Sequence, residues 1–498
     1  MNLNSLILLG ILFSSLTTGL VIFFLKEESH RLRTWLNLLG AGLKLVLVAA
    51  LLWEVQQGQT FAVRFTILPG LDFALGADAK GVLFVTLSTA LWLLTTIYAV
   101  GYLEDSPHRS RFFGFFGLCV SATVGLALAS NLVTFLIFYE LLTLSTYPLV
   151  VHRGTPEAMR GGKVYLCYTM AGGAVLLLAV AWLQTITGPI EFTKDGALKT
   201  LVATHRAELQ ILFFLFIAAL GVKSALVPLH GWLPKAMVAP APVSSLLHAV
   251  AVVKAGAFGV LRLVYDVFGL ETARSLGVLE PLAWLAAFTI LYGSTRALFQ
   301  QKLKTLLAYS TISQVSYIVL GTALFGPLAT IGGLVHLVHQ GLMKITLFFC
   351  AGNYAETLGV HRVDELNGAG RRMPWTTAAF SIAALGMIGV PPLAGYISKQ
   401  FLKEGALAAG ADWAVWVLNL SSLLNAAYFL PILYRAWFKP TPTQWPAEHR
   451  FGRCETHWML LLPPLVTALA VILAGVLADT PFSPLEWAKL IARREYGH

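Results

Sequence analysis

Residues 212–262 read LFFLFIAALGVKSALVPLHGWLPKAMVAPAPVSSLLHAVAVVKAGAFGVLR and place two apolar segments on either side of a proline- and glycine-containing interruption. Each apolar segment carries a lysine, Lys223 in the first and Lys254 in the second. Proline and glycine interrupt a helix, and inside a membrane the freed backbone groups must be buried in protein or face water. The interruption, Val227 to Lys235, therefore predicts a broken membrane-spanning helix.

Long apolar runs recur outward from this stretch along the whole chain. Of the 498 residues, 57% are hydrophobic and 12% are charged, whereas soluble domains carry about 25% charged residues. This composition excludes a soluble globular protein, a disordered chain and a nucleic-acid-binding protein. Because one spanning helix needs about 20 mostly apolar residues, we expect about 14 helices. They are expected near residues 3–25, 34–54, 81–103, 112–129, 131–151, 164–186, 210–228, 241–268, 278–298, 304–324, 328–351, 374–408, 412–437 and 457–478.

A second interruption, GVPPLAG at residues 389–395, matches the first in position. If a five-helix unit starts at the fourth expected helix and repeats from the ninth, the two interruptions fall on helices seven and twelve. Broken helices at corresponding positions indicate a transport site and an inverted repeat. We therefore expect an all-α polytopic membrane protein with a single transmembrane domain, residues 1–498. Within it, residues 112–268 and 278–437, to within a few positions, would form two inverted five-helix repeats.

Several ionisable residues lie within the expected helices, and their cost in a membrane makes each one a functional candidate. Burial and neighbouring charges shift the affinity of a lysine for its proton, whereas arginine stays protonated. Lysine can therefore carry protons when a partner carboxylate moves. Two structural alternatives remain: an ion pair that only holds helices together, at the acidic position, and an anchor at the membrane surface, at the last lysine. The candidates are Glu140, Lys223, Lys254, Lys344 and Lys399.

Histidines and a glutamine extend this set. His336 and Gln340 precede Lys344 at helical spacing, so the three form a polar stripe that drifts slowly around one helix. Histidine titrates near neutral pH, and a polar stripe on a buried helix can hold a file of water. A lone buried histidine is more often a hydrogen-bonding core residue, which is the alternative. The weaker relay candidates are His339, beside the stripe, His248, on a different face from Lys254, and His230, within the first interruption.

Basic residues indicate the orientation of the chain. The net charge is +10, and lysine and arginine gather in the loops after odd-numbered expected helices, for example at Lys26, Arg111 and Lys302. Loops on the cytoplasmic side carry such an excess, so both termini are expected outside a cell inner (plasma) membrane. The four cysteines are far apart and form no CxxC motif. We therefore expect no cofactor, no iron–sulfur cluster and no bound metal.

Three segments resemble signatures of one family. The run 227–262, KTLLAYSTISQVSYI at 304–318 and GVPPLAGYISK at 389–399 are similar to antiporter-like subunits of respiratory complex I, membrane-bound hydrogenases and Mrp-type cation/proton antiporters. The resemblance spans the chain and implies 14 helices, two inverted five-helix repeats and broken helices seven and twelve. It matches the family's helix-five glutamate and its lysines of helices seven, eight, eleven and twelve to Glu140, Lys223, Lys254, Lys344 and Lys399.

Two positions refine the resemblance. Lysine at position 399 favours the D-type subunit of Mrp antiporters, since the complex I subunit of similar length often has glutamate there. Gln340 stands where some members have a second relay histidine. Because glutamine does not titrate, a direct histidine-to-histidine transfer is in doubt there, and a water-mediated path remains open.

The function expected is that of a proton-translocating subunit of a multisubunit Na⁺/H⁺ antiporter, which transports and does not itself catalyse. The resemblance implies that Lys223 loses its proton when Glu140 is drawn away, and that the proton moves through Lys254, His336 and Lys344 towards Lys399. Expected partners are other membrane subunits, the lipid bilayer, protons and Na⁺, and no nucleic acid. One alternative is a proton-pumping subunit of a redox-driven complex. Another is a stand-alone carrier of organic solutes, or a scaffold subunit without transport.

Overall fold

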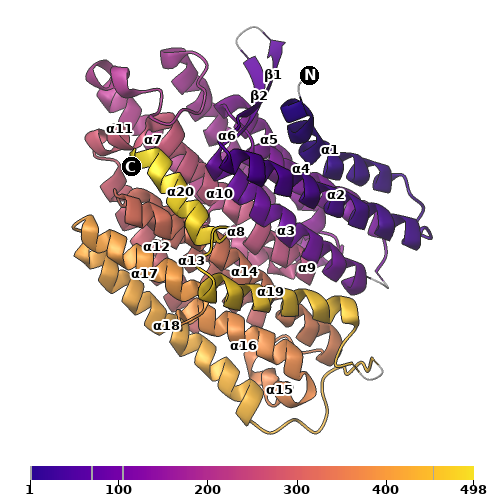
Figure 1. The fold of residues 1–498 in the computed structure, drawn as a ribbon. Helices are drawn as coiled ribbons and strands as arrows, with labels where there is room; N and C mark the ends of the chain where they lie inside the picture. The colour runs from indigo at the N-terminus through magenta and orange to yellow at the C-terminus, as the bar shows by residue number, and fades with distance from the viewer. Residues whose placement is uncertain (1–2, 69–70, 104–105, 452–453, 498) are drawn as a thin grey trace.

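The computed structural model describes residues 3–68, 71–103, 106–451 and 454–497, and helices make up most of it (Figure 1). Within these residues, twelve helices are long and apolar enough to span a membrane. A bent pair, α11 (Leu270–Leu276) with α12 (Leu279–Leu298), adds a thirteenth span. The two halves of the interrupted helix at 374–408 complete the expected set. The prediction of about 14 helices is confirmed.

The first six spans follow the expected ranges closely. Asn131 caps the fifth helix by accepting a hydrogen bond from the main-chain nitrogen of Thr134 at 2.8 Å. Thr155 and Pro156 start the sixth in the same manner, with a side-chain cap and a proline at the first helical position. The six are α1 (Leu3–Phe23), α2 (His30–Gln56), α3 (Ala79–Tyr102), α4 (Arg109–Ala127), α5 (Leu132–Val150) and α6 (Pro156–Thr187).

The first interruption ends a helix at Lys223. The indole nitrogen of Trp232 donates to the carbonyl oxygen of Val222 at 2.7 Å, and so satisfies a main-chain group freed at the helix end. The elements involved are η1 (Lys199–Leu201), α7 (Val202–Lys223), α8 (Trp232–Lys235) and η2 (Ala236–Val238). The eighth span follows as α9 (Ala241–Ser245), the π-helical turn η3 (Leu246–Val250), α10 (Val252–Arg262) and a second π-helical turn, η4 (Leu263–Phe268).

The second interruption separates two half-helices, α16 (Pro374–Ile388) and α17 (Ala394–Ala408). Gly389 ends the first half with a φ of +98°, a left-handed conformation that glycine adopts without strain. Both predicted breaks are therefore confirmed. The elements around them are α13 (Leu303–Ala323), α14 (Pro327–Leu358), η5 (Val363–Leu366), α15 (Ala369–Arg372), α18 (Asp412–Phe438) and α19 (Trp458–Val476).

A hairpin and a C-terminal helix were not predicted from the sequence. Strands β1 (Phe61–Leu68) and β2 (Leu71–Ala77) form an antiparallel hairpin between α2 and α3. After the last span, α20 (Pro484–Tyr496) packs on α3 and α14. Figure 1 shows the hairpin and the N-terminus at the top of the view and the C-terminus, at the end of α20, to the upper left. We call the end of the bundle at which β1 and β2 lie, and at which α20 ends, the hairpin end.

The core lies along α10, α13 and α14, whose residues are almost all buried. By contrast, α1 and α2 on one flank and α18 on the other leave much of their apolar surface exposed (Figure 1). In a membrane such surfaces face lipid or a neighbouring protein. The central position of α14 matters because it carries the predicted polar stripe.

Candidate functional site

Glu140 and Lys223 lie on neighbouring helices. Lys223 is fully buried, donates a hydrogen bond to the carbonyl oxygen of Tyr139, and lies with its Nζ 3.4 Å from the centroid of the Tyr139 ring. Glu140 is half-buried midway along α5. Among the described residues, neither Glu140 nor Lys223 forms an ion pair with an N···O distance of 4.0 Å or less. Lys223 thus bonds the turn of α5 that carries Glu140, without contacting its carboxylate.

A glycine makes room for the Glu140 carboxylate. Gly173 of α6 lies directly against Oε1, and a Cβ atom at this position would overlap that oxygen. The same oxygen is buried and has no hydrogen-bond partner within the part of the chain that the structure describes. The carboxylate therefore sits in a tight pocket between α5 and α6 that only a residue without a side chain permits.

Lys254 joins α10 to α14. Its Nζ, which is fully buried, donates to the carbonyl oxygen of Leu337 at 2.7 Å. The preceding residue, His336, has its Nδ1 2.9 Å from Ser398 Oγ. The Tyr317 ring stacks on the His336 ring, with centroids 5.0 Å apart. The structure therefore brings the helix-eight lysine and the first residue of the polar stripe to the same level of the bundle.

A chain of hydrogen bonds connects Lys344 with Lys399. Lys344 Nζ donates to Ser310 Oγ at 2.7 Å. The Tyr428 hydroxyl lies 2.8 Å from Ser310 Oγ and 2.5 Å from Asn425 Oδ1. The Asn425 amide nitrogen then donates to the carbonyl oxygen of Met387 at 3.2 Å. Lys399 Nζ donates to that same oxygen at 2.7 Å.

Lys399 lies in the first two turns of α17 and caps the other half of its own broken helix. Besides Met387, it donates to the carbonyl oxygen of Ile388 at 3.1 Å and to Ser422 Oγ at 3.0 Å. Its Nζ is 5.5 Å from the centroid of the Tyr317 ring, the ring that stacks on His336. A positive charge at the carbonyl end of a half-helix is favourable, because the helix dipole is negative there.

The other predicted relay residues are less connected. His339 and Gln340 are fully buried in α14, and none of their side-chain polar atoms finds a partner among the described residues. His248 is also buried, has no side-chain hydrogen bond within the described part of the chain, and stacks on Phe348, with ring centroids 4.4 Å apart. His230 is half-buried in the first interruption, its ring 4.9 Å from that of Tyr292.

The hydroxyl and amide groups that link the lysines were not predicted from the sequence. Ser310 lies inside the KTLLAYSTISQVSYI segment, and Ser398 precedes Lys399 in GVPPLAGYISK, so both motifs contained the signal. The signal for Asn425 and Tyr428 was weaker: they are two polar residues three positions apart in an apolar helix. Within the described ranges, no group of three or more histidine, cysteine, aspartate or glutamate side chains is arranged to hold a metal ion.

A bundle of spanning helices with two interruptions, and with lysines buried beside both, defines a multi-pass membrane protein of the ion-transport class. Residues 129–425 match the transmembrane family described as NADH:quinone oxidoreductase/Mrp antiporter, and the chain belongs to this family. The family resemblance expected from the sequence is thus confirmed.

Relatives of two kinds are similar over most of the chain. The N subunit of the NADH-quinone oxidoreductase of Desulforudis audaxviator is 35% identical over 419 residues, covering 82% of each chain. The D subunit of the Na⁺/H⁺ antiporter of Alkalihalophilus pseudofirmus is 25% identical over 486 residues, covering 96% of this chain and 95% of that one. The fold matches a chain of the Mrp complex from a Dietzia species with a TM-score of 0.88 at 24% identity, covering 100% of this chain and 98% of that chain.

Proposed function

We propose that this protein is the proton-translocating subunit of a multisubunit Na⁺/H⁺ antiporter. The observation that carries the proposal is the connected set of hydrogen bonds from Lys344 through Ser310, Tyr428 and Asn425 to the Met387 carbonyl oxygen that Lys399 also binds. If Lys344 or Lys399 had only a structural role, the two lysines would not need to share a hydrogen-bond network that spans α13, α14, α16, α17 and α18.

The proposed path begins at Glu140 and Lys223. When a charge in a neighbouring subunit draws the Glu140 carboxylate away, the Tyr139 carbonyl oxygen and ring are the remaining contacts of Lys223 Nζ among the described residues. Loss of the nearby negative charge disfavours the ammonium form, so Lys223 gives up its proton. The proton then passes through Lys254 and the α14 stripe to Lys399, at the second helix break.

Unpartnered polar atoms support a hydrated path along α14. His336 Nε2, both ring nitrogens of His339 and of His248, and both amide atoms of Gln340 are buried without a protein partner among the described residues. A buried polar group that makes no hydrogen bond costs about 1–3 kcal/mol. Buried waters commonly satisfy such groups. Water between these side chains would carry protons past Gln340, which has no titratable group.

The exposed apolar flanks of the bundle indicate that other membrane subunits bind there. Exposed large apolar side chains occur on α1, α2 and α18, including Trp35, Trp53 and Trp416. The Dietzia structure is that of an Mrp complex, and another match, at a TM-score of 0.86 and 22% identity, is in the membrane-bound sulfane sulfur reductase complex. We infer that neighbouring membrane subunits cover at least one flank. We also infer a plasma-membrane location with both termini outside, and two inverted repeats at about residues 112–268 and 278–437.

A second candidate function is proton pumping in a redox-driven complex. The 35% identity with the Desulforudis N subunit favours it, because that relative belongs to an NADH-quinone oxidoreductase. The same path through Lys344 and Lys399 would serve either function, so the two candidates differ in the source of energy and in the neighbouring subunits.

The test is Na⁺-dependent proton flux by the intact native complex in liposomes. Glu140→Ala is expected to abolish flux while the complex still assembles. The control is Glu157→Gln, which removes an exposed carboxylate that pairs only with Arg160 among the described side chains, at 3.2 Å. Flux driven by NADH or another electron donor, with no Na⁺ dependence, would favour the redox-driven candidate. Failure of assembly in Glu140→Ala would instead indicate a structural role for Glu140.

A further inference from the structure

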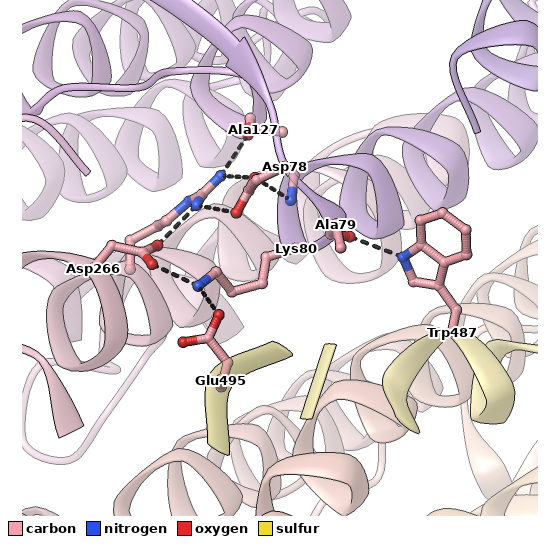
Figure 2. Close-up of polar contacts among 9 residues, drawn as sticks. Asp78, Ala79, Lys80, Ala127, Asp266, Trp487 and Glu495 are labelled. Atoms are coloured by element: carbon pink, nitrogen blue, oxygen red, sulfur yellow. Dashed lines mark hydrogen bonds and ion pairs between the residues drawn. The ribbon is translucent and has the colours of Figure 1, made fainter. Parts of the chain in front are cut away.

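Five charged side chains outside this path meet at the hairpin end. Figure 2 shows four of them, Asp78, Lys80, Asp266 and Glu495, pointing towards one another. Asp78 and Lys80 lie at the start of α3, Arg262 ends α10, Asp266 follows in η4, and Glu495 comes from α20. Lys80 Nζ lies 2.5 Å from Asp266 Oδ1 and 2.6 Å from Glu495 Oε1. We call these five residues the charged cluster.

The other cation of the charged cluster is held by two aspartates. Arg262 makes two hydrogen bonds to Asp78, at 2.6 and 2.7 Å, and one to Asp266 Oδ2 at 2.8 Å. Asp78 also accepts from the main-chain nitrogen of Gly81 at 2.9 Å. Each oxygen of Asp266 therefore binds a different cation, and both oxygens of Asp78 bind the guanidinium. The two aspartates are fully engaged.

The charges of the cluster do not balance. Three carboxylates face two cations. The side chains of Lys80, Arg262, Asp266 and Glu495 are at most 7% exposed, whereas that of Asp78 is 41% exposed and keeps part of its solvation. The excess negative charge is unfavourable for the two buried carboxylates, because water does not solvate them. One bound proton would make the cluster neutral.

Glu495 is the carboxylate that can take this proton. Its Oε2 is buried and has no hydrogen-bond partner among the described residues, unlike any aspartate oxygen of the cluster. Burial raises the pKa of the Glu495 carboxyl; Lys80 opposes this, and the negative charge of Asp266 adds to it. The other charged side chains that line the adjoining cavity of about 720 Å³ are Glu191, Lys194, Arg493 and Arg494.

Hydroxyl groups connect the surroundings of the charged cluster with α14. The Tyr496 hydroxyl is 3.0 Å from Thr330 Oγ1, which is 2.6 Å from the hydroxyl of Tyr265. The Tyr265 ring centroid is 5.7 Å from Lys80 Nζ. Thr330 is buried in the first turn of α14. His336 follows it after six residues, about 9 Å along the helix axis. The charged cluster thus lies at one end of the helix that carries the polar stripe, with a cavity on its other side.

We propose that Glu495 is a proton-binding site that exchanges protons between the α14 path and water at the hairpin end of the bundle. Lys80, Arg262 and the two aspartates position its carboxylate and set the charge of the site. With the proton bound, the cluster is neutral. On release, the proton passes from the Glu495 carboxyl to water in the cavity, and the carboxylate remains opposite Lys80. This inference rests on the proposed function, because it needs protons to arrive along α14.

The experiment compares the intact complex carrying Glu495→Gln with the wild type and with Glu486→Gln. Glu486 is a matched control because it lies on the same helix but pairs with Lys489, at 2.6 Å, away from the charged cluster. Two quantities are measured: proton flux in liposomes against pH on the hairpin side, and the infrared carbonyl signal of protonated carboxyl groups. We expect Glu495→Gln to lower flux about a hundred-fold, in the range that one positioned acid–base group contributes. It should also remove one titrating carbonyl signal, and Glu486→Gln should change neither quantity.

Other results would overturn the inference. If Glu495→Gln keeps both the flux profile and the carbonyl signal, and only melts at a lower temperature, Glu495 is a clamp for α20. If that variant fails to assemble, Glu495→Asp is measured instead: a shifted carbonyl signal supports the proton site, and an unshifted one refutes it. Glu140→Gln is run in parallel. Normal flux in Glu140→Gln refutes the proposed function itself, whereas blocked flux there with normal flux in Glu495→Gln refutes only the site at Glu495.

Discussion

Lys399 of α17 donates a hydrogen bond to the carbonyl oxygen of Met387, 2.7 Å away on the opposite side of the helix break. In a continuous helix this oxygen would accept from the main-chain nitrogen of residue 391, but Pro391 has no N–H to donate, and the ammonium group takes that place. The same oxygen accepts from Asn425, the last member of the chain that starts at Lys344. The interruption predicted from prolines and glycines is therefore also the point where the two lysines become connected.

Replacing Lys399 by arginine separates charge from proton transfer. Lys399→Arg keeps a cation that can cap α16, but arginine stays protonated and cannot pass a proton on. We expect flux to fall about a hundred-fold while the complex assembles normally. Lys403→Arg, one turn further along α17, is the control and should transport like the wild type. Normal flux in Lys399→Arg would show that Lys399 is only an anchor.

Removing the Tyr428 hydroxyl should interrupt the link between Ser310 and Asn425. Tyr428→Phe keeps the ring and loses both contacts, at 2.8 and 2.5 Å. We expect flux to drop several-fold, while the free energy of unfolding falls by only about 1 kcal/mol. The control is Tyr434→Phe on the same helix, where the side chain is exposed. Equal flux in the two variants would exclude the Tyr428 hydroxyl from the path.

Adding one methyl group at Gly173 of α6 should displace the Glu140 carboxylate on the neighbouring helix α5. In Gly173→Ala the new Cβ would overlap Glu140 Oε1, so the carboxylate must move out of its pocket between α5 and α6. Flux is expected to fall, with membrane insertion unchanged. Gly42→Ala in α2 is the matched control, since no other described side chain and no neighbouring element lies within 4 Å of its added Cβ. It should be neutral or slightly stabilising, by about 0.5–1 kcal/mol, because alanine favours a helix.

His152, in the loop between α5 and α6, should make stability depend on pH. Burial, aided by the charges of Arg111, His108 and Arg153, lowers the pKa of His152 from 6.5 to about 4. Between these two values the unfolded chain binds more protons than the folded one, so stability falls as the pH is lowered from 6.5 to 4. The contribution is fully present above pH 6.5. Melting temperatures of the detergent-solubilised protein across this range measure the effect.

His152→Gln should lose that part of the pH dependence, because glutamine does not titrate. His361→Gln replaces an exposed histidine and serves as the comparison. If both variants show the same slope of melting temperature against pH as the wild type, His152 does not contribute to the acid sensitivity of the protein.

Composition and motif spacing were enough to predict the 14 apolar segments, the two interruptions and the lysines within them. Length and hydropathy are local properties, and proline and glycine act on the helix in which they stand, so a single chain suffices to predict them. The hairpin of β1 and β2 escaped prediction because it is short and only its first residues are buried in alternation. The helix α20 was not predicted because its sequence is too polar for a spanning helix, although one of its sides is apolar and packs on α3 and α14.

The groups that these lysines contact depend on how the helices pack against one another, which the sequence pattern does not specify. Lys344 meets Ser310 and Tyr428 because α13, α14 and α18 pack together, and no pattern within one helix specifies that neighbour. Likewise, Lys80 and Glu495 stand at opposite ends of the sequence and form an ion pair only because α20 folds back over the start of α3. Burial makes each charge costly, and the partner that relieves the cost comes from whichever distant segment the packing brings beside it.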